Sequence, residues 1–219
     1  MSRRLRQLRG WGTGHDDQTA RRRSFGSGHR VARTPEQSHR IALLHRGVRA
    51  ATRSEQMQIA EILSELDFGR REDYGLFLNV HYTALQILEP EWRREDRDDF
   101  SSMMVCLRDD LRALNVLPTR LFLIAPGILN LGNRLGIAYT IRGSRRVTRT
   151  LRACVPSAFA GSYLKLDLET NWNSFLREVA QMLEDRTVNV RAEDIVQGAL
   201  IAMQRAAKLF EHALARHHR

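Results

Sequence analysis

Apolar side chains recur every three or four residues along most of this chain, which is the spacing of one face of an α-helix. The first series follows Thr34-Pro35-Glu36-Gln37, a helix start signal in which proline occupies the first turn. It predicts one long helix over 37–66. Its apolar positions are Ile41, Leu44, Val48, Ala51, Ile59, Ile62 and Leu63.

Five further helices follow from the same spacing and from the residues that interrupt it. They are expected over 74–88, where Pro90 ends the helix, and over 97–114, 128–154, 172–183 and 192–216, with an irregular segment over 156–167. No stretch alternates with the two-residue period of a strand. The sequence therefore predicts an all-α fold, a multi-helix bundle without internal repeats.

The helix over 128–154 is unusual because Gly132, Gly136 and Gly143 interrupt it, each at a cost of about 0.5–1 kcal/mol relative to alanine. Two interpretations are open: another helix packs closely at Gly132 and Gly136, or a ligand approaches the backbone. The same helix carries a row of arginines that forms either a solvated face or a site for carboxylate or phosphate groups. These arginines are Arg142, Arg145, Arg149 and Arg152.

Positive charge is concentrated in the first 40 residues, which hold ten arginines against three acidic residues and carry +7 of the net +10. Segment 1–36 is also rich in glycine and poor in large apolar residues, which predicts a disordered, arginine-rich tail before a helical domain over 37–219. The tail either binds polyanions weakly and without sequence preference, or is a solvated tail or an over-extended gene start. With 33 arginines against two lysines, the composition reflects GC-rich coding more than selection for charge.

The usual catalytic and metal-binding signatures are absent from the sequence. There is no GxSxG, P-loop, GxGxxG or HExxH motif, and no ExxH pair of the di-iron type, so neither a catalytic residue nor a metal site is predicted. Cys106 and Cys154 have no CxxC partner, which favours a reducing, cytoplasmic compartment. The apolar run over 121–131 is too short to span a membrane. His81, on an amphipathic face beside aromatic residues, is expected to be a hydrogen-bonded histidine rather than a ligand.

Several segments together resemble the bacterial heme oxygenases, the biliverdin-forming type often paired with phytochromes. Segment 48–53 is similar to that family's first-helix pattern Leu-Arg-x-Ala-Thr, and 73–78 followed by His81 resembles its second-helix signature. Segment 136–144 is similar to the distal-helix sequence Gly-Ala-Leu-Tyr-Val-Leu-Glu-Gly-Ser. The resemblance covers residues 44 to 215 and implies a fold that holds heme between the first helix and a bent distal helix.

Two departures from the family pattern fall on the residues that the reaction needs. The proximal histidine would lie four residues after Thr52, where this chain has Gln56, a poor iron ligand; His45 lies about 16 Å away along the helix. The distal glycine pair is replaced by Val147 and Thr148, whose side chains intrude on the oxygen site. The pocket positions implied by the resemblance are Thr52, Gln56, Tyr139, Gly143, Ser144, Val147 and Thr148.

These features predict a heme-oxygenase-like protein that is catalytically degenerate and acts as a tetrapyrrole-binding, regulatory or partner-binding module, with no resident cofactor. Heme is then a weak ligand or substrate, and a phytochrome is a candidate partner. The alternatives are an active, divergent heme oxygenase that forms biliverdin, carbon monoxide and iron, and a nucleic-acid-associated protein that binds through its tail.

Overall fold

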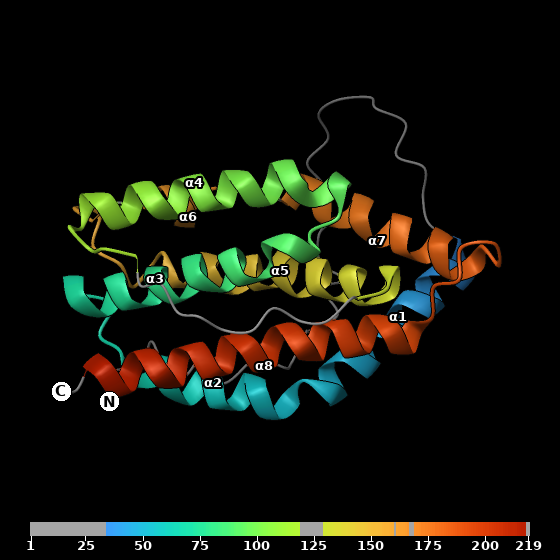
Figure 1. Cartoon of the computed structure of the whole chain (residues 1–219), viewed down its shortest axis with the longest axis horizontal. Helices are drawn as coiled ribbons and strands as arrows, with labels where there is room; N and C mark the ends of the chain where they lie inside the picture. Colours follow the sequence, from blue (N-terminus) through green and yellow to red (C-terminus); the bar gives the residue numbers. More distant parts are fainter. Residues whose placement is uncertain (1–33, 119–128, 160, 167–168, 218–219) are drawn as a thin grey trace.

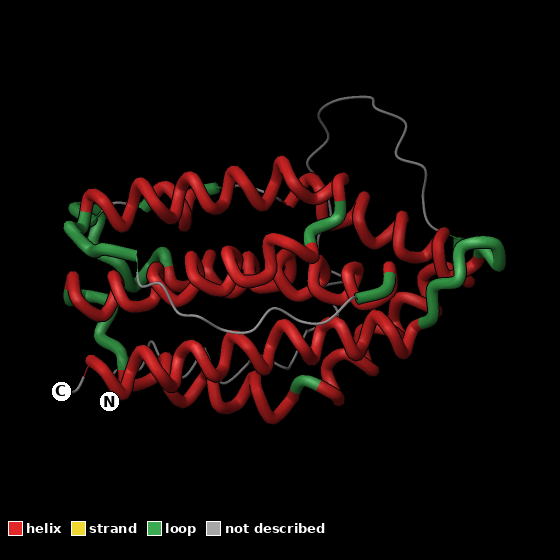
Figure 2. The backbone as a smooth tube through the Cα atoms, viewed as in Figure 1, coloured by secondary structure: helices red, strands yellow, loops and turns green. Residues whose placement is uncertain are grey.

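The computed structural model describes residues 34–118, 129–159, 161–166 and 169–217, with the backbone alone at 146, 147, 149 and 169–171. All regular secondary structure in these ranges is helical, and none of their residues forms a strand (Figure 2). The all-α prediction is therefore confirmed. The predicted disordered tail lies almost entirely outside the described residues.

The helices agree with the predicted series in order, apart from a break in the first helix, one additional short α-helix and two short 3₁₀ helices. Their bounds are α1 Pro35–Ala51, α2 Arg53–Glu65, α3 Arg71–Leu88, η2 Glu89–Glu91, η3 Arg94–Asp96, α4 Arg97–Ala113, α5 Leu131–Leu151, α6 Ser162–Lys165, α7 Glu169–Glu184 and α8 Ala192–His217.

The long helices form a layered bundle in which α3 and α5 occupy the middle (Figure 1). Helix α4 covers one side of α3, and α8 covers its other side while also contacting α1, α2 and α5. Helix α7 packs against α1. The core between these helices is aromatic and aliphatic, with Tyr74, Phe77, Phe100 and Tyr163 among its fully buried side chains. Among the described helices, none has the length and apolar character needed to cross a membrane.

The first predicted helix is wrong in one respect, because it breaks at Thr52. Helix α1 begins as the sequence predicts, with Pro35 in the first turn and a reciprocal capping box between Thr34 and Gln37. At Thr52 the backbone leaves helical geometry, with φ −103° and ψ 8°, and the side-chain hydroxyl donates to the carbonyl oxygen of Val48 at 2.8 Å. Threonines that bond back to the preceding turn are frequent where helices bend. The apolar spacing continues across the break, so periodicity alone does not reveal it.

The backbones of α5 and α8 touch where glycines face each other, which confirms close helix packing at Gly132 and Gly136. A β-carbon added to Gly132 would lie 2.5 Å from Cβ of Asp194, and one added to Gly136 would lie 2.0 Å from the carbonyl oxygen of Ile195. A β-carbon added to Gly198 of α8 would lie 2.0 Å from the carbonyl oxygen of Asn133. The two backbones can approach this closely only because side chains are absent at these positions.

Segment 156–167, predicted to be irregular, contains the short helix α6. The Asp110 carboxylate accepts hydrogen bonds from the backbone N–H groups of Ser162 and Tyr163, both at 2.9 Å. At the other end Arg145 donates to the carbonyl oxygens of Tyr163 and Leu166, at 2.6 and 2.7 Å. A buried anion at the N-terminus and a buried cation at the C-terminus match the helix dipole, and both come from distant helices. Local sequence carries no sign of this stabilisation.

Candidate ligand cavity and the buried charges beside it

A cavity of about 80 Å³ lies inside the bundle, with walls from α2, α3, α4, α5, α6 and α8. Its lining is mainly apolar, and only a few polar groups face it. The polar lining residues are His81, Thr140, Ser144, Thr148 and Tyr163. The apolar ones are Ile59, Leu63, Phe77, Ala84, Leu85, Leu88, Met103, Ile141, Ala202, Met203, Ala206 and Phe210. An apolar cavity with a few convergent polar groups is the usual form of a small-molecule site.

His81 is the one histidine among the described residues that line this cavity. Its Nδ1 donates to the carbonyl oxygen of Phe77 at 3.0 Å, which leaves Nε2 as an acceptor. The ring lies among the aromatic rings of Phe77, Tyr163 and Phe210. Burial, helped by the nearby charge of Arg145, lowers the pKa of His81 to about 4. The imidazole is therefore neutral at physiological pH and has a fixed tautomer.

The hydroxyl groups at the cavity differ in whether their protons already form a hydrogen bond within the protein. Thr140, Ser144 and Thr148 donate to carbonyl oxygens of their own helix, at 3.1, 2.8 and 2.9 Å. The hydroxyl of Tyr163 is buried and has no hydrogen-bond partner among the described residues. Burial also raises the pKa of Tyr163, so this group is a neutral phenol. A buried hydroxyl without a partner is costly, and such a group at a cavity points to an occupant.

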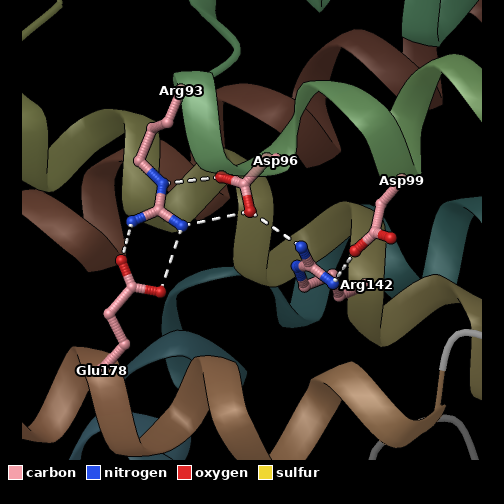
Figure 3. A network of polar contacts seen from close by, with 5 residues as sticks. All are labelled: Arg93, Asp96, Asp99, Arg142 and Glu178. Carbon is pink, nitrogen blue, oxygen red and sulfur yellow. Dashed lines mark hydrogen bonds and ion pairs between the residues drawn. The ribbon is translucent and has the colours of Figure 1, made fainter.

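A network of buried charges fixes the position of α5 (Figure 3). Arg142 of α5 contacts Asp96 and Asp99 at 2.8 and 2.7 Å. Arg93 in turn contacts Asp96 and Glu178, both at 2.6 Å, and links the network to α7. Both guanidinium groups also lie over the ring of Phe175, at 5.6 Å for Arg93 and 5.4 Å for Arg142.

The interpretation of the α5 arginines as a solvated face is wrong for two of the four. Arg142 and Arg145 are both 8% exposed, and each contacts groups of this chain. Arg142 contacts the carboxylates of Asp96 and Asp99, and Arg145 donates to the carbonyl oxygens of Tyr163 and Leu166. Arg152 is exposed, and the side chain of residue 149 lies outside the described atoms.

Of the pocket positions implied by the resemblance whose side chains the structure describes, two line the cavity, Ser144 and Thr148. Thr52 forms the helix break, and Gln56 donates to its hydroxyl at 2.8 Å instead of reaching the cavity. Tyr139 hydrogen-bonds His45 and packs on Trp172. The side chain of Val147 is outside the described residues.

Gly143 differs from the glycines that pack against α8. No atom of the described residues comes within 4 Å of a β-carbon placed there, outside its own helical turn. Close packing therefore does not explain this glycine, and the structure does not place it in the cavity lining either.

Sequence reasoning missed Tyr163, Met203 and the carboxylates of the charge network. Tyr163 belongs to the segment expected to be irregular, and the partners of Arg93 and Arg142 lie up to 85 residues away in the chain. Nothing local marks these residues. Within the described ranges, no group of three or more histidine, cysteine, aspartate or glutamate side chains is arranged to hold a metal ion.

No protein-family model matches the chain, and no curated protein matches it at a significant level.

Proposed function

We propose that this protein is a heme-oxygenase-like helical bundle that binds a ligand in the cavity between α2 and α5 and does not cleave heme. The proposal rests on which residues line the cavity. The first-helix region, which would supply the iron ligand in that family, contributes only Ile59 and Leu63 to the cavity. Neither side chain ligates iron.

Gln56 supports the same conclusion by its position and its partner. Gln56, Ile59 and Leu63 lie on one helical stripe, so Gln56 is one turn beyond the end of the cavity. Its amide nitrogen bonds the Thr52 hydroxyl, and a neutral amide is a poor iron ligand in any case. On the opposite wall, the buried Thr148 occupies space that the family pattern leaves to glycine.

The size of the cavity limits what this conformation accepts. Sites for drug-sized ligands measure about 300–1,000 Å³, whereas this cavity measures about 80 Å³. A tetrapyrrole macrocycle does not fit unless α2 separates from α5. We therefore expect heme and biliverdin to bind weakly, and the function to be binding or regulation rather than heme turnover.

A heme titration of the full chain, followed by absorbance, tests the proposal. The unmodified protein is expected to show no spectrum of histidine-ligated iron and to form no biliverdin with reductant and oxygen. Gln56→His is expected to introduce such a spectrum, because its imidazole would lie one turn from Ile59, the lining residue at the end of the cavity. Gln58→His is the matched control, since Gln58 lies two residues further on and hydrogen-bonds Glu211 instead.

Two outcomes would contradict the proposal. Biliverdin formation by the unmodified protein at the rate of an ordinary heme oxygenase would establish the active enzyme. A histidine-type spectrum of the unmodified protein that disappears in His81→Phe would show that α3 supplies an iron ligand.

A further inference from the structure

The polar groups of the cavity offer acceptors almost exclusively. The Nδ1–H of His81 donates to the carbonyl oxygen of Phe77, so Nε2 has a lone pair that can accept a hydrogen bond. The hydroxyl protons of Ser144 and Thr148 are committed to helix carbonyls, so these oxygens also have only lone pairs left. Among the described lining residues, Tyr163 is the one whose hydroxyl proton has no acceptor.

We propose that this cavity binds a small uncharged molecule that has an apolar body and one O–H or N–H group, which donates a hydrogen bond to Nε2 of His81. The inference rests on the proposed function only in taking the cavity as the binding site. It adds the chemical class of the ligand.

Charge complementarity excludes the ionised alternatives. A carboxylate or phosphate needs several donors, and among the described residues that line the cavity only Tyr163 has a donor that is not already hydrogen-bonded. An ammonium group would meet acceptors, but it would lose its hydration in an apolar space next to the buried Arg145 guanidinium, which lies 4.4 Å from the centre of the Tyr163 ring.

Size sets the upper limit on the ligand. A cavity of about 150 Å³ accommodates benzene, and the present cavity has about half that volume. It therefore suits molecules of about five non-hydrogen atoms. Met203 and Met103 line it, and methionine is the side chain that adapts most readily to a new occupant.

Ligand binding can be measured through the methyl groups of these two methionines. In the full chain labelled at the methionine methyl groups, NMR titration is carried out with butan-1-ol, its isomer 1-methoxypropane, butylamine and butyrate. The alcohol and the ether have the same atoms, but only the alcohol has a donor. The alcohol is expected to shift the Met103 and Met203 signals and to bind about tenfold more tightly than the ether, the difference of one hydrogen bond. The exposed Met57 is the internal control.

Two variants assign the selectivity to His81. His81→Phe keeps an aromatic ring and removes the acceptor, so the alcohol and the ether should bind equally well. His212→Phe, on the exposed face of α8, should leave the tenfold ratio unchanged.

Equal binding of the alcohol and the ether to the unmodified protein would overturn the inference, as would preferred binding of butyrate or butylamine. No shift of the two methionine signals with any of the four compounds would also overturn it, because the cavity would then hold only water. None of these outcomes depends on heme, so a failure here is distinguishable from a failure of the proposed function.

Discussion

Gly136 of α5 and Ile195 of α8 approach so closely that a β-carbon at position 136 would lie 2.0 Å from the carbonyl oxygen of Ile195. The obstacle is backbone, which cannot move away as the end of a flexible side chain can. The two helices must therefore separate to admit even one methyl group, and α8 must then shift against the other helices that it contacts.

Gly136→Ala is accordingly expected to lower the free energy of unfolding by about 3 kcal/mol or more, at the upper end of the cost of overpacking. Gly143→Ala is the matched control on the same helix, where no described atom obstructs the new methyl group. It should raise the free energy of unfolding by about 0.5–1 kcal/mol through helix propensity. Urea denaturation of both variants measures the difference, and equal effects would contradict the packing described here.

Arg142→Met should be strongly destabilising because it leaves Asp96 and Asp99 without this guanidinium in the interior. Removing one partner of a buried ion pair lowers the free energy of unfolding by about 3–5 kcal/mol. Arg40→Met removes a solvent-exposed pair with Glu36 and should leave the unfolding midpoint almost unchanged. If the two variants have similar unfolding midpoints in denaturant, the network does not hold α5 in place.

The neutral state of His81 predicts a specific dependence of stability on pH. Its pKa is about 4 in the folded chain and about 6.5 when unfolded. As pH falls from 6.5 towards 4, the unfolded state takes up a proton that the folded state does not. The free energy of unfolding should therefore decrease over that range by up to about 3 kcal/mol.

His81→Phe removes this contribution, so its stability should depend less on pH between 6.5 and 4 than that of the unmodified chain. His212→Phe provides the comparison, because His212 is exposed and should leave the slope as it is. Denaturant unfolding at several pH values gives the slopes. Identical slopes for the unmodified chain and His81→Phe would show that the imidazole is not buried in its neutral form.

Asp110→Asn should loosen α6 without unfolding the bundle. The change removes the negative charge and one of the two acceptors for the N–H groups of Ser162 and Tyr163. Amide hydrogen exchange in 162–166 should accelerate more than exchange in α5 or α8. Asp109→Asn alters the exposed neighbour and should leave the exchange of α6 unchanged.

The long helices could be predicted from the sequence because each buries one apolar face at regular spacing, and the start of α1 because its cap is local. The break at Thr52 could not, because a threonine hydroxyl forms the same bond in straight and bent helices. The short helix α6 depends on Asp110 and Arg145, which lie about 50 and 20 residues away in the chain. Its stability comes from tertiary contacts that no local pattern records.

The candidate site was less predictable than the fold. Ser144 and Thr148 line the cavity and lie on a helix that the sequence predicts, but the sequence does not show that a cavity lies beside them. The spacing of Arg142 and Arg145 predicted a basic surface. Spacing shows which residues share a helix face, but it does not show whether another helix covers that face. The cavity itself is the space left between six helices, so its volume depends on how their side chains pack.

The position of α8 in the chain has a consequence for synthesis on the ribosome. This helix follows α1, α2, α3 and α5 in the sequence and packs against all four. Until it has emerged, the glycine face of α5 and the apolar sides of α2 and α3 have nothing to pack on. A nascent chain that ends before Ala192 would therefore keep these surfaces exposed, the condition under which chains aggregate or engage chaperones. The growing polypeptide would then become compact in one late step rather than helix by helix.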